Sequence, residues 1–225
     1  MSLFITGTGT GVGKTVVTAT LAAWLKNQGK DVCVYKPIQT GSPDPQLPED
    51  PTRIKSWVGE DLETFCSYCF AEPVAPYAAD PERTIQSGKI LQDYKVLQKK
   101  HEIVLVEGAG GVRVPVAKHL EMIDLIRMLQ LPVLIVASPN LGTINHILLT
   151  VESLMIQRLE ISGVVISDYP DSPIEEISDP AVRTLLPTLE AFLPVPLLGT
   201  LPSITLDTAG IRSTFPAVEK FGLFE

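Results

Sequence analysis

The sequence has few of the residues that build disulfide frameworks or soft-metal sites. Its 225 residues include three cysteines and three histidines. An odd cysteine count argues against a disulfide framework, and His101, His119 and His146 lack the spacing of a metal site. Cys66 and Cys69 form one C-x-x-C pair, which cannot complete a tetrahedral zinc site without further ligands. We therefore expect ordinary thiols there and assign no histidine to catalysis.

The chain also lacks a basic cluster and a long apolar segment. Its net charge is −8, and its longest run of basic residues is Lys99-Lys100, so a nucleic-acid-binding face is not indicated. No apolar stretch reaches the roughly 18 residues that a membrane span needs. An apolar run begins at Leu3, with no leader-like segment before it. These absences predict a cytoplasmic protein that binds neither nucleic acid nor membrane.

Short apolar runs alternate with helical patterns along the whole chain. The runs that predict buried strands are 3–7, 31–36, 102–107, 132–138, 163–167 and 195–201. The patterns that predict helices are 14–28, 50–57, 84–100, 121–129, 143–158 and 179–193. This order predicts an α/β fold with a mostly parallel sheet and helices on both faces. The acidic, proline-rich segments 39–50 and 168–180 are expected to be loops, too short to separate domains, so we predict one domain over residues 1–225.

A glycine-rich segment joins the first predicted strand to the first predicted helix. Residues 4–17 are FITGTGTGVGKTVV, and Lys14-Thr15 opens the helix. Bare glycine amides converge on an anion most easily because no Cβ intrudes, and the helix adds its positive end. In a P-loop, Lys14 would reach the β- and γ-phosphates and the Thr15 hydroxyl would bind Mg²⁺. The usual pattern has glycine where this chain has Thr8, so the loop is one residue longer.

Charged residues near the ends of other predicted strands are candidates for the same edge of the sheet, where ligands of such folds bind. Lys36 ends the second strand and would suit an anionic acceptor, or it is a solvated lysine at a strand end. Glu107 ends the third strand, before Gly108–Gly111, where a carboxylate could hold Mg²⁺. Asp50 is either a third oxygen ligand or the N-cap of a short helix whose first residue is Pro51.

The segment SPNLGTINH follows the fourth predicted strand. Residues Gly142–Asn145 would open the next helix, and its free amides could receive a carboxylate. Asn145 and His146 are either polar contacts or simply residues of the first helical turn.

Taken together, these motifs resemble the dethiobiotin synthetase family, whose members carry a P-loop NTPase fold. The resemblance covers nearly the whole chain. It rests on GTGTGVGKT at 7–15, YKP at 35–37, VEGAGG at 106–111 and LGTINH at 141–146. The P-loop that is longer by one residue is typical of this family.

The resemblance implies an ATP- and Mg²⁺-dependent cyclo-ligase of biotin biosynthesis. CO₂, supplied as bicarbonate, would add to an amine of 7,8-diaminononanoate, and the resulting carbamate would attack the γ-phosphate of ATP. The second amine would then close the ureido ring and expel phosphate. Lys36 would bind the carbamate, Lys14 would bridge it to the γ-phosphate, and Thr10 and Thr40 would orient it.

By the same resemblance, Thr15, Asp50 and Glu107 would hold Mg²⁺. The residues implied to contact the nucleotide are Gly11, Val12, Gly13, Lys14, Thr15, Val16, Asp50, Glu107, Gly108, Ala109, Gly110, Ser167, Asp168, Pro202, Ser203 and Ile204. The family works as a homodimer, so the backbone at Leu141, Gly142, Thr143 and Asn145 would take the substrate's tail carboxylate from the partner subunit.

The chain departs from the family pattern at two places. Gly9 and Gly11 stand where acidic residues are common in the family, and Ser167 precedes Asp168 where asparagine is common. A serine cannot offer adenine the paired donor and acceptor of an asparagine amide.

Two other kinds of protein share such a P-loop half. A partition- or division-type switch ATPase would act through a membrane or DNA surface, and the chain has neither a basic patch nor a terminal amphipathic helix. A cobyrinate-type amide synthase would need an additional glutaminase domain, for which 225 residues leave no room.

Overall fold

The computed structural model describes residues 2–224. The strands are β1 (Leu3–Gly7), β2 (Val32–Thr40), β3 (Glu63–Phe70), β4 (Ile103–Gly111), β5 (Pro115–Ala117), β6 (Leu120–Glu121), β7 (Val133–Ala137), β8 (Ile161–Tyr169) and β9 (Leu197–Pro202). The helices are α1 (Lys14–Asn27), α2 (Glu49–Val58), α3 (Pro76–Ala79), α4 (Ser87–Lys100), α5 (Met122–Leu129), α6 (Thr143–Ile156), α7 (Pro180–Arg183), α8 (Leu185–Phe192), α9 (Thr208–Ser213) and α10 (Phe215–Glu219), with a 3₁₀ turn, η1, at Ile174–Glu176. None of these helices is long and apolar enough to cross a membrane.

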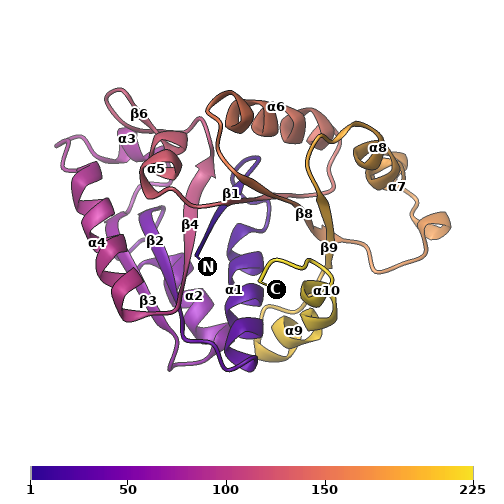
Figure 1. Cartoon of the computed structure of the whole chain (residues 1–225), viewed down its shortest axis with the longest axis horizontal. Coiled ribbons are helices and arrows are strands. Elements are labelled where there is room, and N and C mark those ends of the chain that lie inside the picture. The colour runs from indigo at the N-terminus through magenta and orange to yellow at the C-terminus, as the bar shows by residue number, and fades with distance from the viewer. Residues whose placement is uncertain (1, 225) are drawn as a thin grey trace.

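Within these residues, seven strands form one sheet in the order β3-β2-β4-β1-β7-β8-β9, and every neighbouring pair is parallel. All six predicted strands are present, and the predicted α/β architecture is confirmed. The central strand β1 lies between β4 and β7, so the loop after it opens at the middle of the sheet's carboxyl edge (Figure 1).

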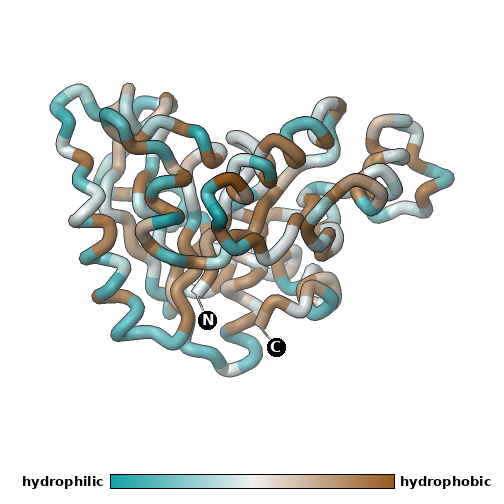
Figure 2. The backbone as a smooth tube through the Cα atoms, turned by 45° about the horizontal axis from the view of Figure 1, so that its top comes forward, coloured by the Kyte–Doolittle hydropathy of each residue, from teal (hydrophilic) through white to brown (hydrophobic). Residues whose placement is uncertain are grey.

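Helices cover both faces of the sheet. One apolar cluster packs α4, α5, α6 and α8 against the first face, and a second cluster packs α1, α2, α9 and α10 against the opposite face. Buried side chains on both sides explain why the central strands are continuously apolar. Figure 2 shows that segments of hydrophobic residues run through the middle of the molecule and that many hydrophilic segments lie toward the outside.

Two elements differ from the sequence prediction. Strand β3, which contains the C-x-x-C pair, was not predicted because its residues, ETFCSYCF, mix polar and aromatic side chains and are only half-buried at the sheet edge. The single helix predicted over 179–193 is divided into α7 and α8. Pro187 lies in the first turn of α8, where a missing N–H is tolerated, and a continuous helix would have placed it in the interior.

The ends of two strands also lie further along the chain than predicted. Lys36 was expected to end its strand, but β2 continues to Thr40, so Lys36 lies inside it. Glu107 likewise lies within β4, which continues to Gly111 and places Glu107 opposite Ile5 of β1. Both side chains therefore start from the rigid sheet and not from loops.

Candidate active site at the carboxyl edge of the sheet

The P-loop joins β1 to α1 and has the backbone that its glycines predict. Gly11 and Gly13 have φ values of 76° and 94°, in the left-handed region that disfavours other residues. Gly13 is the N-cap of α1, and a Cβ there would lie 2.3 Å from Ser167 Oγ. Glycine is thus required at position 13 both by the backbone conformation and by the contact with β8.

Lys14 is buried in this loop. Its Nζ donates to the carbonyl oxygen of Gly9 at 2.8 Å. Burial and the positive charge of nearby Lys36 together lower the pKa of Lys14 to about 8, against the opposing effect of Glu107 and Asp50.

Four side chains from three separate elements and the P-loop helix meet beside Lys14. The Nζ of Lys36 lies 2.6 Å from Asp50 Oδ2 and 2.7 Å from Glu107 Oε1. The Thr15 hydroxyl donates to the same Glu107 Oε1 at 3.0 Å. Residues from α1, α2, β2 and β4 therefore form one connected polar cluster, although they are up to 92 positions apart in sequence.

Burial alone would lower the pKa of Lys36, but the adjacent Glu107 and Asp50 carboxylates outweigh it and raise the pKa above its ordinary value. For Asp50, burial acts to raise the pKa, yet the charge and hydrogen bond of Lys36 hold the pKa below the ordinary value. The lysine is thus kept positively charged and its partner Asp50 negatively charged.

The structure excludes one of the two predicted roles of Asp50 at the start of α2, and its role as a metal ligand stays a prediction. The N-cap of this helix is Pro48, and Asp50 lies within the first turn with its carboxylate on Lys36. The N-cap role for Asp50 was therefore wrong.

A cavity of about 360 Å³ contains this cluster. Lys14 and Lys36 both line it, as do most of the predicted phosphate and metal contacts. Its predicted members are Thr10, Gly11, Gly13, Lys14, Thr15, Val16, Lys36, Thr40, Asp50, Glu107, Ala109 and Gly110.

Sequence reasoning missed four residues of the same cavity, namely Gln39, Arg53, Trp57 and Leu206. Gln39 belongs to the segment KPIQTG, so its neighbours Lys36 and Thr40 could have pointed to it. Arg53 and Trp57 lie three and seven residues after Asp50, the spacing of one helix face.

Three of the side chains that line the cavity carry oxygen atoms that suit a hard divalent cation. They belong to Thr15, Asp50 and Glu107, and Mg²⁺ prefers hydroxyl and carboxylate ligands. Within residues 2–224, the second carboxylate oxygen of Glu107 is buried without a hydrogen-bond partner, and a bound cation would satisfy it. These residues therefore fit Mg²⁺. The described residues hold no group of three or more His, Cys, Asp or Glu side chains arranged for a metal.

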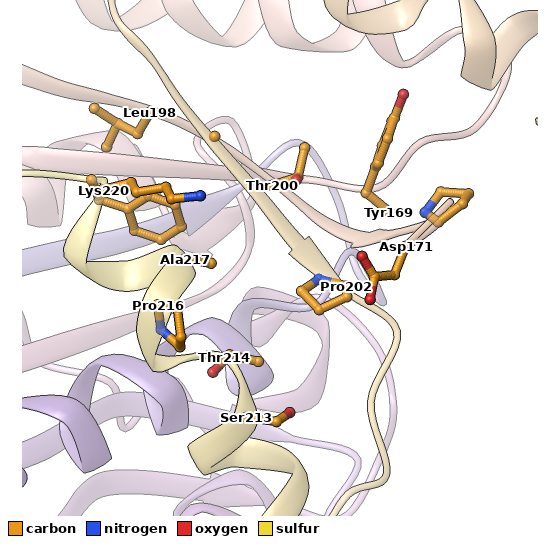
Figure 3. Close-up of a pocket in the computed structure, with 13 residues that line it drawn as sticks. Tyr169, Asp171, Leu198, Thr200, Pro202, Ser213, Thr214, Pro216, Ala217 and Lys220 are labelled. Atoms are coloured by element: carbon orange, nitrogen blue, oxygen red, sulfur yellow. The ribbon is translucent and has the colours of Figure 1, made fainter. Parts of the chain in front are cut away.

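The predicted base-binding residues lie at the ends of β8 and β9. Ser167 is buried against Gly13, whereas Asp168 has φ 60° and its carboxylate accepts a hydrogen bond from Ser203. The cavity in Figure 3, about 420 Å³, lies beside edge strand β9 and helices α9 and α10, and Pro202 is the predicted base contact that lines it. The base-contact roles of these residues, like that of Ile204, stay predictions.

A third hollow, of about 450 Å³, adjoins the cavity around Lys14 and Lys36. Thr10 and Gly110 line both. Its wall is largely apolar and includes Val112, Val114 and Leu149. Leu141, two residues before α6, lines neither this hollow nor the cavity around Lys14, and it is 89% exposed.

The three thiols are free, as expected. Burial raises the pKa of Cys33 and of Cys66 to about 12, and it also raises the pKa of Cys69. They are therefore poor nucleophiles and poor metal ligands.

With this geometry established, comparison with known proteins gives a consistent result. A family model described as an AAA domain matches residues 1–209. The chain is 38% identical over 205 residues to the ATP-dependent dethiobiotin synthetase BioD of Bacillus subtilis (strain 168), covering 89% of this chain and 87% of that protein. It is 37% identical over 223 residues to the BioD of Anaeromyxobacter dehalogenans, covering 97% and 99%.

Among solved structures, the cell division ATPase MinD of Pyrococcus furiosus matches with a TM-score of 0.59 and 17% identity, covering 98% of this chain and 99% of that one. This likeness shows the shared P-loop NTPase fold alone. The sequence relatives are much closer, and they agree with the motifs at the carboxyl edge of the sheet. The chain therefore belongs to the ATP-dependent dethiobiotin synthetase family.

Proposed function

We propose that this chain makes dethiobiotin from 7,8-diaminononanoate, CO₂ and ATP, as an ATP-dependent cyclo-ligase of biotin biosynthesis. One observation carries the proposal beyond the family name. Lys14 and Lys36, the two buried ammonium groups of the carboxyl edge, line the same cavity. A triphosphate and a carbamate repel each other, and more strongly where water is excluded, so two cations in one cavity suit a reaction that joins them.

In the proposed reaction, a neutral amine of the substrate adds to CO₂ and releases a proton, and Lys36 Nζ binds the resulting carbamate. The carbamate oxygen attacks the γ-phosphorus while the bond to ADP breaks, and Lys14 stabilises the charge on the transferred phosphoryl group. The second amine attacks the carbonyl carbon, loses a proton and displaces phosphate. Thr10 and Thr40, which line the cavity, orient the acceptor. Positioning and charge neutralisation carry this catalysis.

Mg²⁺ would be held by Thr15, Asp50 and Glu107, and it would supply positive charge against the negative charge of the triphosphate. Asp50 and Glu107 also pair with Lys36. Sharing these carboxylates with a metal would leave the Lys36 ammonium free to bind the carbamate.

The adjoining apolar hollow supports a site for the aliphatic part of the diamine. Val112, Val114 and Leu149 offer apolar contacts to a hydrocarbon chain, and Arg113 also lines the hollow. Thr10 borders both cavities, so a substrate lying in the apolar hollow would place its amines beside the P-loop.

We also propose that the protein is a homodimer, in which the backbone at 141–145 of one subunit takes the tail carboxylate bound to the other. Large apolar side chains of α6 and the residues before it support this, since Leu141, Leu149, Met155 and Ile156 are between 51% and 89% exposed. Sedimentation equilibrium at micromolar concentration should give twice the chain mass of 24.4 kDa. A monomer under turnover conditions would contradict the proposal. The cytoplasmic location stays a prediction.

One assay separates this function from a switch ATPase. Phosphate release from ATP and Mg²⁺ should require both bicarbonate and the diamine, because the γ-phosphate has no acceptor until the carbamate forms. Omitting either one is the control. Steady release of phosphate without them would favour the switch ATPase.

A further inference from the structure

The first turn of α2, which carries Asp50, has no capping side chain of its own. Its N-cap is Pro48, which makes no side-chain hydrogen bond to the helix. Instead, two side chains from the segment 39–42 accept hydrogen bonds from the first turn. Ser42 Oγ accepts from the Glu49 amide at 2.8 Å, and Gln39 Oε1 accepts from the Asp50 amide at 3.3 Å.

Both of these side chains are buried and are held by a second contact. Ser42 is fully buried, and its hydroxyl donates to the Leu47 carbonyl at 3.0 Å. Gln39 is 4% exposed, and its Nε2 donates to the Thr40 carbonyl at 2.9 Å. With two partners each, neither side chain has freedom to move away from the helix.

The backbone between them is also fixed. Gly41 has φ 78°, and its amide donates to the Glu72 carbonyl at 3.0 Å. The Ser42 amide donates to the Phe70 carbonyl at 3.1 Å. The segment that holds α2 is thus anchored to β3 and to the residues that follow it.

This arrangement connects the two members of the Lys36–Asp50 pair. Lys36 and Gln39 lie three residues apart on β2, and Gln39 binds the amide of Asp50 itself. Without this contact, the first turn of α2 would depend on a proline N-cap, and helix ends without caps fray. The position of the Asp50 carboxylate therefore depends on the side chains of Gln39 and Ser42.

We propose that Gln39 and Ser42 are positioning residues that hold Asp50 in place for Mg²⁺–triphosphate binding. The inference rests on the proposed function, because Asp50 is a metal ligand only in that account. Residues behind metal ligands commonly change metal affinity about 10-fold or more when they are replaced.

The experiment uses Gln39→Met, which keeps the size of the side chain and removes its hydrogen bonds, and Ser42→Ala. ATP binding is measured by calorimetry with and without Mg²⁺, and exchange of the Glu49 and Asp50 amides is measured by NMR. We expect the affinity gained from Mg²⁺ to fall about 10-fold, metal-free ATP affinity to stay within about two-fold, and the two amides to exchange faster. Gln39→Glu, which keeps the acceptor for the Asp50 amide, should restore slow exchange.

Ser56→Ala and Gln92→Met are the matched controls, because both side chains are exposed and Ser56 lies near the other end of α2. Faster amide exchange with an unchanged gain from Mg²⁺ would show a purely structural cap and overturn the inference. An equal loss of affinity with and without Mg²⁺ would also overturn it. A wild-type protein that gains no affinity from Mg²⁺ would instead contradict the proposed function. Thermal unfolding of each variant confirms that it is folded.

Discussion

Lys14 and Lys36 are both buried ammonium groups, yet their surroundings move their pKa values in opposite directions. Lys14 contacts a carbonyl oxygen, and burial lowers its pKa to about 8. Lys36 lies between two carboxylates, which raise its pKa. In the free protein, the ammonium form of Lys14 is therefore the one that an incoming anion would stabilise most, because Lys36 is already paired with two carboxylates.

This difference predicts that ATP binding takes up a proton at Lys14. A bound triphosphate stabilises the ammonium form and raises its pKa, so a group that is partly neutral in the free protein becomes charged. With a free pKa of about 8, uptake should rise from about a quarter of a proton at pH 7.5 to about nine-tenths at pH 9, and affinity should fall as pH rises through 8. Calorimetry in buffers of different ionisation enthalpy measures it.

The matched variant for this prediction is Lys14→Arg, whose guanidinium stays charged over the whole range. It should show no pH-dependent uptake, even where its affinity is altered. Equal proton uptake by the wild type and Lys14→Arg would contradict the assignment of the low pKa to Lys14.

At the scale of elements, the edge strand β3 decides the chemistry of the C-x-x-C pair. Cys66 and Cys69 are three residues apart on one strand, so their side chains point to opposite faces of the sheet. A disulfide needs the two Cβ atoms within about 4.5 Å of each other and facing one another. The extended backbone therefore prevents the pair from acting as a redox motif.

We predict that the native protein forms no disulfide under mild oxidant and reacts slowly with iodoacetamide at pH 8. A thiol pKa near 12 in place of 9 lowers the thiolate fraction about 1000-fold, so Cys33 and Cys66 should be labelled after the less buried Cys69. Mass spectrometry of native samples, with guanidinium-unfolded protein as the control, counts the labels. Rapid double labelling, or a Cys66–Cys69 bond in the folded protein, would contradict this account.

At the scale of the whole molecule, the sequence was sufficient for the central part of the fold and for most of the cavity. Buried strands are apolar on both faces, so β1, β2, β4, β7 and β8 could each be predicted from the sequence. The edge strand β9 is only partly buried, but its run LLGTLP is apolar enough to be recognised. Strand β3 could not, because it gains its order from pairing with β2 at the sheet edge and not from an apolar run. Local patterns contain no information about such pairing.

The same limit explains what was missed around the active site. The P-loop, Lys36 and Glu107 are local motifs, and the structure brings them together. The start of α2 was misplaced because Asp50-Pro51 is a good local start signal. The actual first turn is capped by Ser42 and Gln39, which lie seven and eleven residues before the amides that they bind and outside the usual N-cap position. A cap supplied by tertiary structure leaves no signature next to the helix that it stabilises.

The central claim is that the Lys36 ammonium serves the acceptor anion and not the nucleotide, and Lys36→Gln tests it most directly. Its amide can still donate to Glu107, so the buried carboxylate keeps a partner, and Lys89→Gln on the exposed face of α4 is the control. Two quantities are compared, the Kd for ATP with Mg²⁺ by calorimetry and kcat with diamine and bicarbonate. We expect kcat to fall by about 10²–10³-fold with Kd changed less than about three-fold. A collapse of nucleotide affinity, with kcat at saturating ATP preserved, would place Lys36 in the phosphate cradle and contradict the account.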